Sequence, residues 1–311
     1  MLVIRKLHIK PTKNINRPAA EAAGRWLPFV KMFSRAHALG QQITAASNEE
    51  PEPTALLPLE TAAAGRGPKV IICSPHPDDE LLTGALPLRL LQEQGATIIN
   101  LAVTLGSKSA RRQERLHELE QACGLIGFNS RLAAQPAGFE RINPEARKAP
   151  DWPAKAKELA VIFAEIKPDF ILFPHAADHH PTHEGTHLLV MDALAAWHTG
   201  SSRIILVETE FWQPMPRPNL LVGLNNNDLA LMLAALSRHK GEIARNPYHL
   251  SQPARMMDNV RRGRELIGQG DHSPDFLFGE LYRISLWENG GRKMIDKAMV
   301  CGPEESLDFK L

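Results

Sequence analysis

The sequence predicts an α/β fold, with a mostly parallel sheet covered by helices on both faces. Short apolar runs rich in β-branched residues alternate along the chain with longer segments of helical spacing. Several of these runs are apolar throughout, which is typical of strands buried on both faces. Glycines stand where two of the helices should end, at Gly95 and Gly127. Strands that alternate with helices in this way favour a sheet wrapped on both sides.

The elements follow one another from residue 68 onward. The predicted strands are Lys69–Cys73, Thr97–Thr104, a weaker one near Arg131–Ala134, Asp169–Phe173, Arg203–Glu208 and Phe276–Leu286. The predicted helices are Glu80–Gln94, Arg111–Leu125, Pro153–Ile166, His183–Trp197, Asn226–Ala244 and Pro253–Gly268. Pro87 should kink or break the first helix, because proline lacks the backbone N–H that an interior position needs.

The 311 residues divide into three predicted parts. Residues 1–66 are an N-terminal extension and linker, with a candidate amphipathic helix near Glu21–Leu39 that Pro28 interrupts, and a segment rich in Pro, Ala and Gly at Pro51–Gly67. Residues 67–290 form the main domain, and residues 291–311 a C-terminal tail.

Charge and composition narrow the class of protein. The 36 basic and 35 acidic residues leave a net charge of +1, whereas nucleic-acid binders usually carry a basic excess. We therefore expect no nucleic-acid partner. Residues 1–50 hold eight Lys or Arg and three Glu, a composition that fits a solvated basic arm or a docking surface for an acidic partner.

Cysteine usage and hydropathy bear on the cellular compartment. The three cysteines are widely spaced and form no CxxC pair, so they predict neither a disulfide framework nor a thiolate zinc site. Met1–Ile4 is apolar but Arg5 and Lys6 end the run, and no stretch of 18 apolar residues follows. We expect a cytoplasmic protein without a membrane span, and leave its homo-oligomeric state open.

Two segments carry residues suited to catalysis, and each directly follows a predicted strand. The first is Ser74–Glu80 (SPHPDDE) and the second His175–His187 (HAADHHPTHEGTH). Ligands of open α/β sheets bind at the carboxyl ends of the strands, where the strand order reverses. If the two strands are neighbours, these loops meet across that crevice.

The residue types in these segments predict a divalent metal. Asp78 and Asp79 are adjacent carboxylates beside His76, and buried carboxylates repel each other unless a cation lies between them. One Asp can ligate zinc while the other takes a proton from water, and a histidine of the second segment would complete a three-ligand catalytic site. The plainer alternative is that the histidines lie on surface loops and the aspartates cap a helix.

The first segment resembles the PHPDDE signature of the PIG-L/LmbE family of N-acetylglucosaminyl deacetylases. The resemblance runs from about Pro68 to Leu286. The family's second motif, HPDH, stands here as His180-Pro181-Thr182-His183, and its TxG turn as Thr104-Leu105-Gly106. Supporting matches are Arg115-Leu-His-Glu118-Leu, Leu125-Ile-Gly127, Tyr248-His249 and Gly279-Glu280-Leu281-Tyr282.

The resemblance implies a Rossmann-like three-layer α/β/α sandwich and a role for each site residue. His76, Asp79 and His183 would bind Zn²⁺ or another divalent metal, and Asp78 would be the base that activates the attacking water. His180 would act near the carbonyl oxygen. Arg112 and Arg115, after the TxG turn, would reach a substrate hydroxyl or phosphate, although a solvated helix face explains them as well.

The sequence departs from the family pattern at two positions. Thr182 replaces an aspartate that orients and charges the preceding histidine, which puts the pKa of His180 in doubt; Asp178 is close enough in sequence to substitute. Ser107 replaces a glutamate after the TxG turn.

The predicted function is a zinc-dependent hydrolase that removes an N-acetyl group from a sugar or sugar conjugate. Two alternatives remain: a hydrolase of another N-acyl substrate, and a non-catalytic metal- or ligand-binding protein on the same fold. Aromatic residues make up only 6% of the chain, so we expect no sugar-stacking platform.

Overall fold

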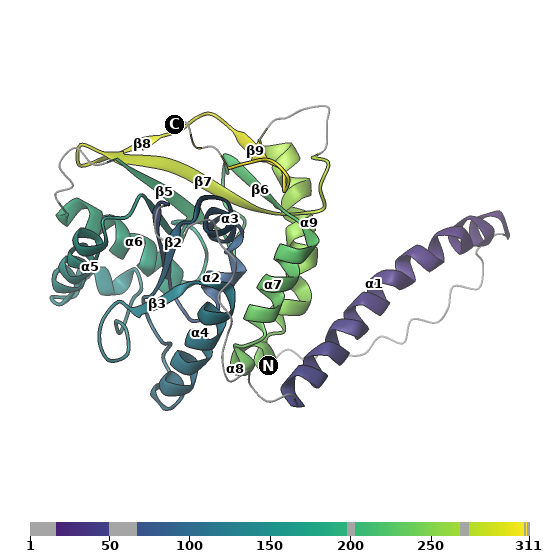
Figure 1. The fold of residues 1–311 in the computed structure, drawn as a ribbon, viewed down its shortest axis with the longest axis horizontal. Helices are drawn as coiled ribbons and strands as arrows, with labels where there is room; N and C mark the ends of the chain where they lie inside the picture. The colour runs from purple at the N-terminus through teal and green to yellow at the C-terminus, as the bar shows by residue number, and fades with distance from the viewer. Residues whose placement is uncertain (1–16, 50–66, 198–202, 268–273, 308, 310–311) are drawn as a thin grey trace. The chain divides into compact units, whose positions relative to one another are not determined.

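The computed structural model describes residues 17–49, 67–197, 203–267, 274–307 and 309 (Figure 1). The chain divides into two units, Met1–Glu52 and Pro53–Leu311. The described part of the first unit is helix α1 (Arg17–Glu49), which extends beyond the predicted Glu21–Leu39 and contains Pro28 in its interior. The predicted linker at Pro51–Gly67 lies almost entirely outside the described residues.

The second unit is built on one mixed sheet. Among the described residues, nine strands join it in the order β3-β2-β1-β4-β5-β7-β6-β9, with β8 added beside β7. The first five strands of this order are mutually parallel: β3 (Asn129–Leu132), β2 (Thr97–Ala102), β1 (Lys69–Ser74), β4 (Phe170–Pro174) and β5 (Ile204–Thr209). The remaining strands are β7 (Phe278–Glu288), β6 (Leu220–Leu224), β9 (Met299–Cys301) and β8 (Gly291–Met294). The parallel half confirms the predicted α/β fold class.

The strand order reverses at β1. From β1 the chain builds outward through β2 to β3, then returns to add β4 and β5 on the other side. β1 and β4 are therefore parallel neighbours, with Val70 opposite Phe170 and Ile72 opposite Leu172. The two histidine-bearing loops leave the carboxyl ends of these strands, so the predicted adjacency is confirmed.

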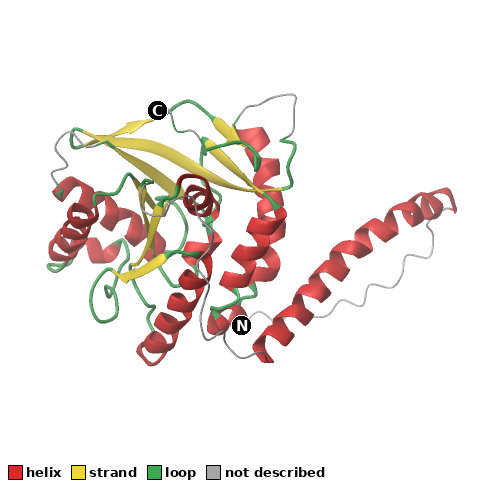
Figure 2. Ribbon diagram, in the orientation of Figure 1, coloured by secondary structure: helices red, strands yellow, loops and turns green. Residues whose placement is uncertain are grey.

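Helices cover both faces of the sheet (Figures 1 and 2). Along β1, Val70 and Ile72 point into one apolar cluster, whereas Ile71 and Cys73 point into the other. Helices α3, α4 and α7 contribute to the first cluster, and α5 and α6 to the second. The strand is apolar throughout because each of its faces is buried by a different helical layer.

The helices have these bounds: α2 (Asp79–Leu82), α3 (Ala85–Gln94), α4 (Arg112–Ile126), α5 (Trp152–Ile166), α6 (Pro181–Ala196), α7 (Asn226–Leu236), α8 (Lys240–Arg245) and α9 (Tyr248–Leu266). Short 3-10 turns occupy Ser109–Arg111 and Glu145–Lys148. Gly95 and Gly127 end α3 and α4 in the left-handed conformation, as predicted.

The predicted helix Glu80–Gln94 is two helices with a break at Thr83 and Gly84. Pro87 falls in the first turn of α3, where its missing N–H costs no hydrogen bond. Two buried residues of β7 occupy the break. The carboxylate of Glu280 accepts the N–H of Ala85, and the Tyr282 hydroxyl donates to the carbonyl of Thr83. The break is thus fixed by a strand nearly 200 residues later in the chain.

The C-terminal part of the chain differs most from the prediction. The predicted helix Asn226–Ala244 is split into α7 and α8, and strands β6, β8 and β9 were not predicted. β7 is antiparallel to both β5 and β6. The segment 291–311, predicted as a tail, contributes β8 and β9 to the sheet.

Candidate active site

The site lies where the loop after β1 meets the N-terminus of α6. His76, Asp78 and Asp79 come from the first loop and the start of α2. His180 directly precedes α6, and His183 lies in its first turn. Pro181 is the first residue of α6, where its fixed φ angle suits a helix start. The structure therefore brings together all five residues to which the sequence assigned metal binding or catalysis.

Three of these residues have the spacing of metal ligands. Asp79 Oδ2 lies 3.4 Å from His76 Nδ1 and 3.4 Å from His183 Nε2. In a tetrahedral zinc site with bonds of about 2.0–2.2 Å, neighbouring ligand atoms are about 3.3–3.6 Å apart. The two separations of 3.4 Å fall within that range. Asp79 Oδ2 is also held by the backbone N–H of His76, at 2.8 Å.

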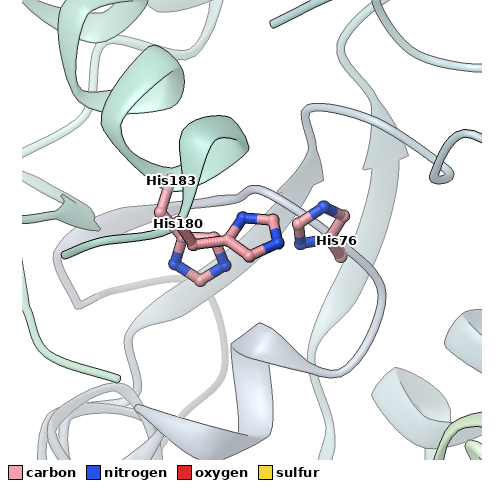
Figure 3. Close-up of side chains that lie close together, drawn as sticks. All are labelled: His76, His180 and His183. Atoms are coloured by element: carbon pink, nitrogen blue, oxygen red, sulfur yellow. The ribbon is translucent and has the colours of Figure 1, made fainter. Parts of the chain in front are cut away.

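His180 completes a group of three imidazoles (Figure 3). One ring nitrogen from each of His76, His180 and His183 lies within 4.8 Å of the others. The ring centroid of His180 is 5.1 Å from that of His76 and 4.9 Å from that of His183. His180 therefore stands beside the predicted ligand set, as a fourth ligand or as a group facing the reacting carbonyl.

Asp178 fixes the orientation of His183. Its Oδ2 lies 2.5 Å from His183 Nδ1, which leaves Nε2 directed toward Asp79. Burial alone would lower the pKa of His183, but Asp79 and Asp178 outweigh it and raise the pKa to about 10. A carboxylate behind a ligating imidazole fixes its tautomer and strengthens it as a ligand. The sequence offered Asp178 as a candidate partner for His180, but its carboxylate lies against His183 instead.

His180 lacks such a partner. Its Nδ1 is buried and has no hydrogen-bond partner among the described residues. Burial, with the neighbouring His76 and His183, lowers the pKa of His180 to about 4. The imidazole is therefore neutral at pH 7.

Asp78 occupies a strained position at the start of α2. Its φ angle is 114°, a left-handed conformation that residues with a side chain rarely adopt. The backbone N–H of Asp78 donates to Glu80 Oε2 at 2.9 Å, and the other oxygen of Glu80 contacts His239 Nε2 at 2.7 Å. These two buried contacts hold the backbone of Asp78 in place. Burial, reinforced by Asp79 and Glu80, raises the pKa of the Asp78 carboxyl well above its usual value.

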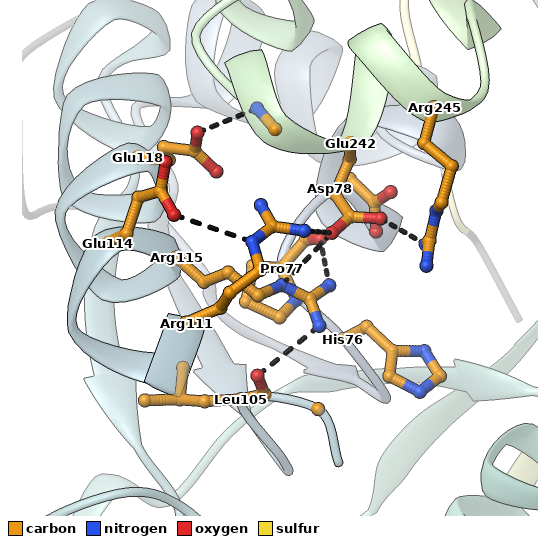
Figure 4. A network of polar contacts seen from close by, with 12 residues as sticks. His76, Pro77, Asp78, Leu105, Arg111, Glu114, Arg115, Glu118, Glu242 and Arg245 are labelled. Atoms are coloured by element: carbon orange, nitrogen blue, oxygen red, sulfur yellow. Dashed lines mark hydrogen bonds and ion pairs between the residues drawn. The ribbon is translucent and has the colours of Figure 1, made fainter. Parts of the chain in front are cut away.

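Arg115 joins the loop after β1 to the turn after β2 (Figure 4). Its guanidinium donates to the carbonyl oxygens of Leu105 and Pro77, both at 3.2 Å, and lies 3.4 Å from Glu242. Its contacts are thus to the protein itself, although it also lines the cavity. Arg112 is more exposed and pairs with Glu140 at 2.9 Å. Of the two predicted substrate contacts, Arg112 is the more accessible.

The site opens into a cavity of about 740 Å³, within the usual range for small-ligand sites. The lining is mostly polar. Besides the candidate ligands it includes Thr104, Ser107, Ser109, Glu140, Arg141, Asn143, Thr182, Glu242 and Arg245.

Aromatic side chains at this cavity were not predicted. Phe211, Trp212 and Tyr248 gather at its wall, with ring centroids 4.9–6.2 Å apart. Trp212 lies nearly parallel to the His180 ring, at 5.6 Å. The low aromatic content of the chain gave no sign of this, because composition does not reveal where residues gather. The position of Trp212 soon after β5, at the same sheet edge as the motif loops, was the available signal.

The other histidines of the second segment do not face the metal site. His175 is buried, with Nε2 at 3.0 Å from the carbonyl of Gln213. His187 is buried against the carbonyl of Pro174, at 2.9 Å from Nδ1. His179 is exposed.

Comparison with known families gives a match over the segment that holds both motif loops. The model of the family described as "PIG-L: GlcNAc-PI de-N-acetylase" matches residues 71–194. The segment that holds both motif loops is therefore similar to the PIG-L family. The search of curated proteins finds no match.

Solved structures share the fold around the PIG-L segment. A conserved protein, TT1542, from Thermus thermophilus is 21% identical, with a TM-score of 0.52 over 70% of this chain and 93% of its own. The N,N'-diacetylchitobiose deacetylase of Pyrococcus horikoshii is 18% identical, with a TM-score of 0.52 over 70% of this chain and 84% of its own. A 4-carboxy-2-hydroxymuconate hydratase from Pseudomonas putida is 16% identical, with a TM-score of 0.50 over 70% of this chain and 95% of its own.

These neighbours share an architecture but differ in reaction, so the likeness shows the fold alone. No helix in the described part of the chain is long and apolar enough to cross a membrane.

Proposed function

We propose that this chain is a metal-dependent hydrolase that removes an N-acetyl group from a sugar or sugar conjugate of the N-acetylglucosamine type. The family match supports the reaction class. The observation that carries the proposal is the ligand-like spacing of His76, Asp79 and His183 beside a second buried carboxylate, Asp78. Metal binding alone would not need that second carboxylate.

The residues fit a divalent cation. His183 Nε2 is buried and has no hydrogen-bond partner among the described residues, although it faces Asp79. The negative potential that raises the pKa of His183 would equally favour a cation at that nitrogen. Imidazole and carboxylate ligands suit zinc, and we propose His76, Asp79 and His183 as the ligands.

A cation in this place would polarise the acetyl carbonyl and make a water molecule more acidic. Asp78 would accept the proton of the attacking water. A carboxylate with a raised pKa is a stronger base than an exposed one, and burial raises the pKa of Asp78. The strained backbone and the Glu80 contact hold this base in one position.

His180 would act as a neutral hydrogen-bond donor. The pKa of about 4 leaves His180 uncharged at pH 7. A neutral N–H facing the carbonyl oxygen can still stabilise charge that develops there. The C–N bond of the amide then breaks, the acyl carbon keeps the water oxygen, and the amine nitrogen takes the proton. The products are acetate and a free amino sugar.

The test is acetate release from N-acetylglucosamine derivatives, with metal content measured on the same samples. We expect Asp78→Ala to retain metal and to lose at least about a hundredfold in turnover, whereas Asp79→Ala loses the metal as well. Asp192→Asn is the matched control, because Asp192 lies on α6 but pairs with Arg147, at 2.7 Å, away from the cavity.

Equal turnover in the wild type and Asp78→Ala would contradict the proposed mechanism. A wild-type protein that binds metal but releases no acetate would instead support the non-catalytic alternative. Release of a longer acyl group in preference to acetyl would favour a different N-acyl substrate.

A further inference from the structure

We propose that Trp212 is the stacking surface for the substrate's sugar ring, and that Asp178 fixes this surface at a set distance from the metal-facing histidine. The proposal rests on the deacetylase function proposed above and specifies how the same site would recognise a carbohydrate. It assigns a substrate-binding role to the loop after β5, which contains neither of the sequence motifs.

Trp212 is accessible in a way that a core tryptophan is not. Its side chain is 47% exposed, whereas Trp152 and Trp287 are 3% and 5% exposed. It lines the same cavity as His76, Asp79 and His183. A large apolar ring held open to solvent costs free energy in the unliganded protein, and a ligand that covers it recovers that free energy.

The chemistry of the cavity wall matches a sugar. A pyranose ring presents C–H groups on its faces and hydroxyl groups around its edge. Trp212 offers a flat apolar surface for one face. Ser107, Asn143 and Thr182 line the same cavity and offer hydrogen-bonding groups for the edge. An acyclic amide or a purely apolar ligand would use only part of this set.

The loop that carries Trp212 is held by several contacts. The backbone N–H groups of Phe211, Trp212 and Gln213 all donate to Asp178 Oδ1, at 3.3, 2.8 and 3.1 Å. Behind the loop, the guanidinium of Arg255 lies 5.2 Å from the centre of the Phe211 ring. A surface held in this way binds a ring without first losing conformational freedom.

Asp178 links this platform to the metal site. While Oδ1 accepts the three amides, Oδ2 lies 2.5 Å from Nδ1 of His183. One fully buried carboxylate thus sets both the orientation of a proposed metal ligand and the position of the aromatic loop. The arrangement would place an N-acetyl substituent toward His183 when the sugar ring lies against Trp212.

The direct test is binding. Intrinsic tryptophan fluorescence of the wild type is titrated with glucosamine and with N-acetylglucosamine, with and without metal, and compared with Trp212→Phe, Trp212→Leu and Trp212→Ala. We expect a saturable signal in the wild type that disappears with the indole in all three variants. Calorimetry should then show binding by Trp212→Phe within about threefold of the wild type and about tenfold weaker binding by Trp212→Leu and Trp212→Ala.

The kinetic test separates stacking from support of His180. For an N-acetylglucosaminide, Trp212→Ala and Trp212→Leu should raise KM about tenfold with little change in kcat. For an acyclic N-acetyl amine, the same variants should keep the wild-type kcat/KM. The control is Leu266→Ala, which removes an apolar side chain of similar exposure, 48%, on α9 and should leave both substrates unaffected.

Each outcome has a defined meaning. Unchanged sugar binding in Trp212→Ala would overturn the proposal. An equal loss of kcat for both substrates would also overturn it, because Trp212 would then act only by supporting His180. Sugar binding that depends on Trp212 without any acetate release would keep the stacking proposal and refute the deacetylase function, so the two can fail separately.

Discussion

Replacing Asp178 with asparagine tests whether its carboxylate sets the tautomer of His183, because the substitution changes only one side-chain oxygen to an NH₂ group. The carbonyl oxygen of the new amide side chain would still accept the N–H groups of Phe211, Trp212 and Gln213, so the loop should hold. The new NH₂ group, however, would take the place of Oδ2, which lies 2.5 Å from His183 Nδ1. His183 would then have to carry its proton on Nε2, the nitrogen that faces Asp79, and that nitrogen would lose the lone pair needed for a metal.

The expected magnitude follows from these contacts. Loss of an orienting carboxylate typically weakens metal binding about 10- to 100-fold, which is about 1.4–2.8 kcal/mol. Asp178→Ala removes the acceptor of three backbone amides as well, and at about 1 kcal/mol for each we expect a further loss of about 3 kcal/mol in the free energy of unfolding. Asp178→Asn should avoid most of this second loss.

The assay is a competitive zinc titration at about pH 7.5, above the usual pKa of histidine, with urea unfolding of the metal-free proteins run in parallel. Asp192→Asn makes the same chemical change on α6, where Asp192 accepts from Trp152 Nε1 at 2.8 Å, and should keep wild-type affinity. Wild-type zinc affinity in a folded Asp178→Asn protein would refute the tautomer argument.

Three further predictions concern pH, packing and metal removal. Burial raises the pKa of Glu280 to about 7 from its usual 4.5. The folded state therefore holds a proton on Glu280 at pH values where the unfolded state does not, and the free energy of unfolding of the wild type should fall by about 3 kcal/mol between about pH 5 and pH 8. Glu280→Gln should remove that slope in urea melts at each pH, and an unchanged slope would exclude Glu280 as its source. Gly185→Ala should lower the free energy of unfolding by about 1–3 kcal/mol, because the Cβ of the new alanine would clash with the backbone of Asn143. Stability equal to wild type would mean that the loop around Asn143 moves aside without loss of stability. A chelator should lower the melting temperature of the wild type but not of Asp79→Ala, and equal shifts in both would place the metal elsewhere.

The parallel half of the sheet could be predicted because its signal is local. β1 and β4 are short apolar runs between helical segments, and each is followed by a polar, histidine-bearing loop. Burial on both faces demands such runs, so the pattern appears in the sequence itself. Two of the C-terminal strands, β8 and β9, were missed for the opposite reason: they are short and only partly buried, so their pairing with β7 and β6 leaves little local pattern. The third, β6, is a buried apolar run like β1 and was missed although its local pattern is present.

The position of the break between α2 and α3 is determined by residues that are distant in the sequence. Pro87 indicated a disturbance but not its place. The break falls earlier, at Gly84, because Glu280 and Tyr282 supply hydrogen-bonding groups there in place of the helical ones. Those residues belong to β7, and their contact with α3 exists only in the folded chain.

By itself the sequence determined the residues of the proposed site, since His76, Asp78 and Asp79 stand within four positions and His180 and His183 share one helical turn. Only the tertiary structure decided which atoms face one another. It set Asp79 between two imidazoles, directed Asp178 to His183 rather than His180, and brought Trp212 beside the same cavity. The chemistry of a side chain depends only on the type of residue, whereas the distances between loops depend on how the sheet orders its strands.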